Sequence, residues 1–284
     1  MMDEAKFNAL VRLLDDPDPL VAEAVEREMT ALGIDGVAWL EEAWERTESE
    51  SIQYKIEETI QRIQYAHYTQ KLLEWRLSGG ENLFEGWWIL TQIQYPTMNL
   101  AALQNELKRM AHKIWLNLDP YMTDVEKLVV VNKHVYHLNH YSGNYGPDDN
   151  PDYNFLKTII ETKRSNSLGM AAFYYGLCNE LGITLQLVNF QGYYALRYYS
   201  RDSHFYVDTF NNGAFFSPEN VVQFLKKINA ESDPNHYKPL SNIYVLLQLI
   251  RQLADGYKER KPERAEIYDR LLKDIEIKLP GSTL

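Results

Sequence analysis

The sequence predicts an α+β protein that is mostly helical and carries one small antiparallel sheet. Apolar residues recur at helical spacing through most of residues 4–138, as expected of amphipathic helices. Two aromatic stretches, 184–199 and 204–210, have the composition of strands, and a polar turn at 200–203 joins them. After residue 217 the helical period returns. Helices that flank a local antiparallel unit are typical of this class.

The composition indicates a chain with enough apolar material for a packed core. Of 284 residues, 45% are hydrophobic and 13% aromatic, which argues against general disorder. The apolar runs fall far short of the roughly 20 residues that span a bilayer, and the N-terminus lacks the basic-then-apolar pattern of a signal peptide. A single cysteine excludes an internal disulfide and a cysteine-rich zinc site. We therefore expect a cytoplasmic protein with no membrane partner.

Negative charge is concentrated at the beginning of the chain. The net charge is −11, and residues 1–50 hold 14 Asp and Glu against 4 Lys and Arg, which gives −10 for that segment alone. An acidic surface repels phosphate backbones, so nucleic acid is not expected as a partner. Solvated helix faces are the simplest interpretation of these charges.

The chain is expected to be helical from residue 4 to residue 77. A first short helix stops at the acidic, proline-containing stretch 15–19. Asp18 is a suitable N-cap for the second helix, and Pro19 fits its first position. The stretch 13–33, LLDDPDPLVAEAVEREMTALG, resembles one HEAT-type helical repeat unit. Two further helices complete this region: 37–44 and 52–75.

Three more helices follow a break at Ser78-Gly79-Gly80. They cover 83–93, 100–115 and 125–138. Pro96 ends the first of them, because the residue before a proline is pushed out of the helical region. Thr123 and Glu126 predict a capping box at the start of the last one.

The segment 163–213 is the part around which the rest of the chain is organised. A polar turn at 164–166 opens an apolar helix at 168–181, which Gly182 ends, and the two aromatic strands come next. Three helices then complete the chain: one capped by Ser217 with Pro218 at its first position, one at 240–253 and one at 263–277.

Three positions in this segment carry a resemblance to a known family. Ser167 stands fifteen residues before Gly182, Tyr193 lies in the run NFQGYY, and Asp208 lies in FYVDTFNNG. On these residues the segment resembles the transglutaminase-like core, a papain-related fold, in the form found in bacterial SirB-type proteins. The resemblance implies that a catalytic Cys, His and acid would occupy the positions of Ser167, Tyr193 and Asp208.

The resemblance extends over most of the chain, from about residue 13 to residue 217. It includes the runs LFEGWWILTQIQYP at 83–96 and LDPYMTDVEKLVVVN at 118–132, and the loop 142–144. It implies a helical N-terminal region packed on a papain-like core. We therefore expect three regions: 1–78, helical and HEAT-like; 79–228, the transglutaminase-like core with its preceding helices; and 229–284, a tetratricopeptide-like helical hairpin.

The triad positions do not reproduce the chemistry of the family. In the parent site a helix N-terminus lowers the pKa of the cysteine thiol, and a histidine oriented by a carboxylate takes the proton. A serine needs a base, and a tyrosine with a pKa near 10 is a poor one at neutral pH. We therefore expect a catalytically degenerate protein, without a cofactor, whose cleft binds a peptide or a small ligand.

Two other functions stay open. One is a hydrolase or acyl-transfer enzyme that uses Ser167 in place of the cysteine. The other is a helical-repeat adaptor that binds a protein partner through the acidic N-terminal region. Each candidate residue also has a structural interpretation: Ser167 as the N-cap of its helix, Asp208 as an acceptor for the Tyr193 hydroxyl or for Asn211 and Asn212, and Arg197 as an exposed strand residue.

The remaining chemically active residues are expected to be structural. His134, His137 and His140 recur at a spacing that could place them together, but no acidic or cysteine ligand accompanies them, so a metal site is not expected. His204 lies four residues from Asp208, about 13 Å along a strand, beyond hydrogen-bond reach. Cys178 has apolar and aromatic neighbours, which predicts a buried thiol.

Overall fold

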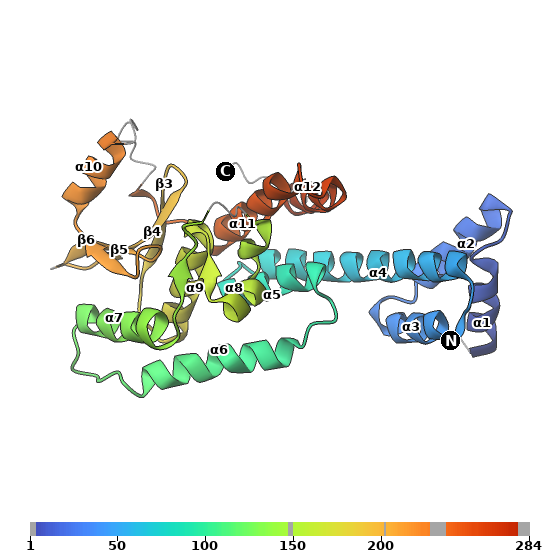
Figure 1. The fold of residues 1–284 in the computed structure, drawn as a ribbon, viewed down its shortest axis with the longest axis horizontal. Coiled ribbons are helices and arrows are strands. Elements are labelled where there is room, and N and C mark those ends of the chain that lie inside the picture. The colour runs from blue at the N-terminus through green and yellow to red at the C-terminus, as the bar shows by residue number, and fades with distance from the viewer. Residues whose placement is uncertain (1–3, 147–149, 202, 228–236, 278–284) are drawn as a thin grey trace. The chain divides into compact units, whose positions relative to one another are not determined.

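The computed structural model describes residues 4–146, 150–201, 203–227 and 237–277 (Figure 1). The chain divides into two compact units, Met1–Glu74 with Gln92–Pro96 and Trp75–Thr91 with Thr97–Leu284. The predicted division into 1–78, 79–228 and 229–284 stays a prediction, and its boundary at residue 229 lies outside the described residues.

The first unit is built from helices. They are α1 (Glu4–Leu13), α2 (Pro19–Thr30), the short 3-10 helix η1 (Ile34–Gly36), α3 (Val37–Arg46) and most of α4 (Glu50–Leu77). Asp18 caps α2 as predicted, since its side chain accepts a hydrogen bond from the Leu20 N–H at 2.9 Å. Fully buried Leu14, Met29, Leu40 and Ile56 hold these helices together around one core.

In the described part of the second unit, helices, a four-stranded sheet and a two-stranded parallel pair pack around α9. Its helical elements are most of α5 (Leu83–Gln94), α6 (Leu100–Trp115), α7 (Asp124–Asn132), the π-helix η2 (Lys133–Leu138), the 3-10 helix η3 (Pro151–Asn154), α8 (Leu156–Thr162), α9 (Ser167–Glu180), α10 (Pro218–Lys227), α11 (Asn242–Tyr257) and α12 (Pro262–Ile277). Thr123 and Glu126 form the predicted capping box of α7. α9 is apolar on nearly all sides, and such a helix is stable only when it is buried. Most of its residues are buried.

The main sheet contains four antiparallel strands within the described residues. Its order is β3 (Gln186–Phe190), β4 (Tyr193–Tyr199), β5 (His204–Asp208) and β6 (Ala214–Phe216). A second, parallel pair consists of β1 (Ser142–Gly143) and β2 (Arg164–Ser165), and β2 leads into α9. The predicted α+β class with a small antiparallel sheet is confirmed.

The expectation of one strand over residues 184–199 is wrong, because a hairpin turn divides it. Gln191 and Gly192 both have positive φ, 54° and 91°. A turn with two left-handed residues matches the twist of the strands it joins. Asn189 closes the turn, since its side chain accepts a hydrogen bond from the Gly192 N–H at 2.6 Å.

The position of Tyr193 follows from this hairpin. Tyr193 is the first residue of β4, and it pairs with Phe190 across the turn. The sheet face that carries Val188, Ala195 and Tyr206 packs against α10. Tyr193 lies on the same face and packs against the same cluster. β5 ends at Asp208, one strand away from Tyr193.

Candidate functional site

The N-terminus of α9 is capped by Asn166. Asn166 has extended backbone angles, φ −74° and ψ −179°, and its side chain accepts a hydrogen bond from the Gly169 N–H at 2.8 Å. Ser167 is therefore the first helical residue, and the interpretation of Ser167 as the N-cap is wrong. Asparagine and serine are equally good caps, so the composition of this turn does not distinguish them.

The Ser167 hydroxyl is bonded to the backbone of β4. Its oxygen accepts a hydrogen bond from the Tyr194 N–H at 2.9 Å and lies 3.4 Å from the Tyr194 carbonyl oxygen, to which it donates. A carbonyl oxygen cannot take a proton at neutral pH. Ser167 thus connects the first turn of α9 to the edge of the hairpin, and these bonds do not activate its oxygen as a nucleophile.

The Tyr193 hydroxyl donates a hydrogen bond to Asp208 at 2.6 Å, which confirms the expected pairing of these two side chains. Its oxygen accepts a second bond from the Asn211 side-chain amide at 2.9 Å. Burial raises the pKa of Tyr193, and the bond to the Asp208 carboxylate raises it further. The phenol therefore keeps its proton at neutral pH and cannot act as a general base.

Asn211 is present in the site as one of the partners expected for Asp208, whereas Tyr145 was missed in the sequence. Asn211 donates to both Asp208 oxygens, from its backbone N–H at 3.1 Å and from its side chain at 2.6 Å. Tyr145 lies 2.6 Å from the Asn211 side-chain oxygen and packs its ring against Phe210 at 4.7 Å. The polar run that follows Asp208 indicated a turn, but Tyr145 lies far away in the sequence and no local pattern connects it to Asp208.

The loop that carries Asn211 is fixed from the helix side. The Asn132 side-chain amide donates to the Gly213 carbonyl oxygen at 2.9 Å, and its oxygen accepts from the Tyr174 hydroxyl at 2.8 Å. The buried Tyr136 hydroxyl donates to the Thr209 carbonyl oxygen at 2.9 Å. These bonds connect α7, η2 and α9 to the loop after β5, so the Asp208 carboxylate is held from several elements.

The other sequence candidates lie outside this cluster. His204 packs its ring against Tyr199 and Tyr206, at 5.3 Å from each. Arg197 is half-buried and donates to the Gln186 side chain and to the Tyr237 carbonyl oxygen, so the expectation of an exposed strand residue is wrong. In the part of the chain that the structure describes, no group of three or more His, Cys, Asp or Glu side chains could hold a metal ion.

Cys178 is buried as predicted, and we expect it to resist alkylation in the folded protein. Burial raises the pKa of the thiol, so the reactive thiolate is scarce. Because the folded pKa exceeds the unfolded one, the thiol's contribution to stability is complete below about pH 8.5 and is lost as pH rises through the folded pKa. Iodoacetamide at about pH 8 should modify Cys178 only after denaturant is added. Mass spectrometry of the treated protein measures the modification. Rapid modification of the native protein would contradict this.

None of the helices in the described ranges is long and apolar enough to cross a membrane.

Comparison with known proteins identifies a family and two curated relatives of this chain. Residues 101–251, just over half of the chain, match the model of the transglutaminase-like superfamily. A UPF0162 protein of Xylella fastidiosa strain Temecula1 is 24% identical over 155 residues, which cover 52% of this chain and 55% of the relative. The UPF0162 protein of strain 9a5c has the same identity and coverage. The chain thus spans about half the length of these curated relatives. No solved structure matches it.

Proposed function

The chain belongs to the transglutaminase-like superfamily, and we propose that it is a catalytically degenerate member whose cleft binds a peptide or a small ligand without turning it over. The observation that carries the proposal is the Tyr193 hydroxyl. At the position that the resemblance gives to the catalytic histidine, it donates to Asp208 and accepts from Asn211.

The bonds at the triad positions support the absence of catalysis. Acyl transfer needs a base that can remove the proton of the nucleophile. The Tyr193 pKa is raised, so this residue does not supply a base. The Ser167 hydroxyl is bonded to the Tyr194 backbone. The alternative of an enzyme that uses Ser167 would require a base from elsewhere.

The groups around Asp208 support binding of a polar ligand. Asn211 is exposed, Tyr145 is 64% exposed, and Tyr193 and Asp208 are half-buried. Together they offer hydroxyl, amide and carboxylate groups beside the Phe210 ring, which are the groups that recognise a peptide backbone and its side chains.

The finer parts of the assignment are also proposals. We infer a SirB-type protein from the motifs at 83–96 and 118–132 that accompany the core. We infer a tetratricopeptide-like hairpin from α11 and α12, which are joined by a short turn and pack against each other (Figure 1). We also propose a cytoplasmic location.

A blocked glutaminyl-glycine peptide added to ¹⁵N-labelled protein tests binding and turnover together. We expect amide shifts at Tyr145 and Asn211, while the signals of the peptide itself stay unchanged during long incubation. Asn211→Ala should reduce the shifts, because it removes the amide that joins Tyr193 to Asp208. Asn212→Gly, at the neighbouring exposed position with positive φ, is the matched control and should bind like the wild type.

Each part of the proposal has its own contrary result. Hydrolysis or deamidation of the peptide that disappears in Ser167→Ala would favour the enzyme that uses Ser167. Absence of shifts would remove the glutaminyl peptide as a ligand of this cleft.

A further inference from the structure

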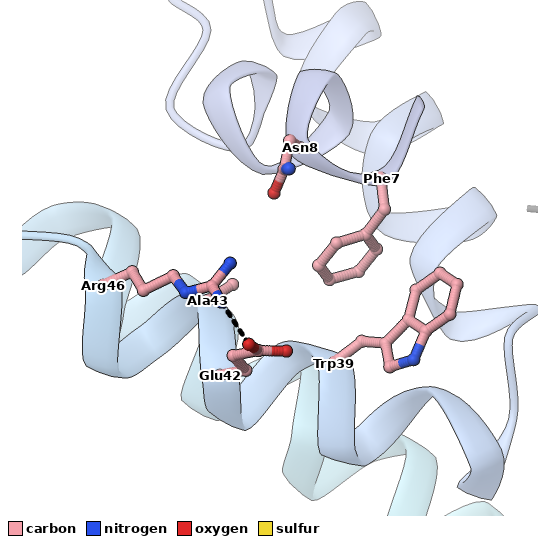
Figure 2. Close-up of a pocket in the computed structure, with 6 residues that line it drawn as sticks. All are labelled: Phe7, Asn8, Trp39, Glu42, Ala43 and Arg46. Carbon is pink, nitrogen blue, oxygen red and sulfur yellow. Dashed lines mark hydrogen bonds and ion pairs between the residues drawn. The ribbon is translucent and has the colours of Figure 1, made fainter. Parts of the chain in front are cut away.

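A groove lies between α1 and α3 in the first unit. Its volume is about 260 Å³. Six side chains line it: Phe7, Asn8, Trp39, Glu42, Ala43 and Arg46. Figure 2 shows that they face one another from the two helices, with the two aromatic rings side by side and the Glu42–Arg46 ion pair away from them. The rings of Phe7 and Trp39 pack edge to face, and their centroids lie 5.5 Å apart.

The groove has an apolar floor and an incompletely covered wall. Phe7 and Ala43 are buried, whereas Trp39 is 40% exposed. Pockets for whole small molecules measure roughly 300 to 1,000 Å³, so a groove of about 260 Å³ is better suited to one or two side chains of a larger partner. Filling it would remove apolar indole surface from water, which is favourable.

The helix that forms one wall of the groove is surrounded by carboxylates. Residues 35–50 contain six acidic residues and one basic residue, Arg46, which is paired with Glu42. The six acidic side chains are all exposed: Asp35, Glu41, Glu42, Glu45, Glu48 and Glu50. These negative charges attract cationic partners over about 8 Å at physiological salt.

We propose that this groove binds a cationic amphipathic segment of another protein. One apolar side chain of the partner inserts beside Phe7 and Trp39. Lysine or arginine side chains of the same partner lie over the carboxylates of α3. Apolar burial supplies the affinity, and the carboxylates supply the preference for basic partners.

The same charges argue against other occupants. Nucleic acid and anionic lipid surfaces would be repelled by the exposed carboxylates. A second copy of this chain would bring two acidic α3 helices together, and like charges across an interface are strongly unfavourable. The cationic segment is therefore the occupant that matches both the apolar floor and the surrounding charge.

Binding can be tested on the full-length chain with a dye-labelled synthetic amphipathic helix of leucine and lysine, by fluorescence anisotropy. We expect saturable binding that weakens as salt rises. Trp39→Ala should weaken it at least about tenfold, as expected for a central aromatic anchor. The double variant Glu41→Lys/Glu45→Lys should weaken it and reduce its salt dependence.

Matched controls separate the groove from general effects. Trp115→Ala removes a tryptophan that is 60% exposed on α6, and Glu259→Lys/Glu266→Lys makes the same charge change at exposed positions near and on α12. Both should bind like the wild type. If Trp39→Ala disturbs folding by circular dichroism, Asn8→Arg obstructs the groove from an exposed position instead.

Several results would overturn the proposal. Equal binding of a scrambled peptide or of a leucine–glutamate peptide would show that neither shape nor charge is recognised. Wild-type affinity in Asn8→Arg and in a folded Trp39→Ala would place the contact elsewhere. Self-association in sedimentation that Asn8→Arg abolishes would make a second copy the occupant.

Discussion

Replacing Gly213 by alanine is expected to lower the free energy of unfolding by roughly 3–5 kcal/mol. Gly213 has a φ of 71°, where a side chain costs about 1 kcal/mol. The larger effect is steric, because an added Cβ would lie 2.1 Å from the Asn132 side-chain oxygen. Asn132 cannot turn away cheaply, since it is bonded to the Gly213 carbonyl oxygen and to the Tyr174 hydroxyl.

Urea denaturation followed by intrinsic fluorescence measures this loss. Gly182→Ala is the matched control, because Gly182 has a φ of 70° and nothing within 4 Å of the added Cβ. It should cost only about 1 kcal/mol. Similar losses in the two variants would mean that backbone strain dominates and that Asn132 adapts.

The expected cost at Gly213 also concerns the candidate site. Gly213 donates its N–H to the Asp208 carbonyl oxygen at 2.8 Å, and so closes the loop that holds Asn211 against the Asp208 carboxylate. A glycine that is required for close packing thus stands between the buried Tyr174 of α9 and the polar cluster at the end of β5. A side chain at position 213 would therefore displace the loop and disturb the bonds between Asn211 and Asp208.

Features that depend on neighbouring residues could be predicted from the sequence. Asp18 before Pro19 and Thr123 before Glu126 have local patterns that lead to a cap, and both caps are present. Burial of Cys178 followed from the apolar residues around it. The sequence offered the Tyr193 hydroxyl and the turn with Asn211 as two alternative partners of Asp208, and Asp208 is bonded to both residues.

Features that depend on two residues competing for one role, or on contacts between residues far apart in the sequence, could not be predicted. Asn166 and Ser167 are both suitable caps, and backbone direction, rather than residue type, decides between them. The aromatic run around Gly192 hides a turn, because a single glycine in a strand pattern also fits a bulge. Tyr145 reaches Asn211 only through the fold.

Asn166→Ala is expected to cost roughly 3 kcal/mol of unfolding free energy, about 1 from the lost helix cap and about 1 from each partner left without a donor. Besides capping α9 at the Gly169 N–H, the Asn166 side chain donates to the side-chain oxygens of Asn154 and Gln252, each at 3.0 Å. Asn154 is buried in η3, and Gln252 lies on α11. One amide therefore joins the start of α9 to two other elements.

Three variants separate these contributions in urea denaturation. Asn99→Ala removes an exposed cap whose side chain accepts a hydrogen bond from the Ala102 N–H of α6, at 3.0 Å, and should cost about 1 kcal/mol. Asn166→Asp keeps the acceptor for the cap but loses both donors, so it should remain well below the wild type in stability. The loss from Gln252→Ala should shrink when Asn166 is already alanine, because the shared bond is then absent. If Asn166→Ala costs no more than Asn99→Ala, the bonds to Asn154 and Gln252 contribute nothing, and the connection from α9 to α11 rests on apolar packing alone.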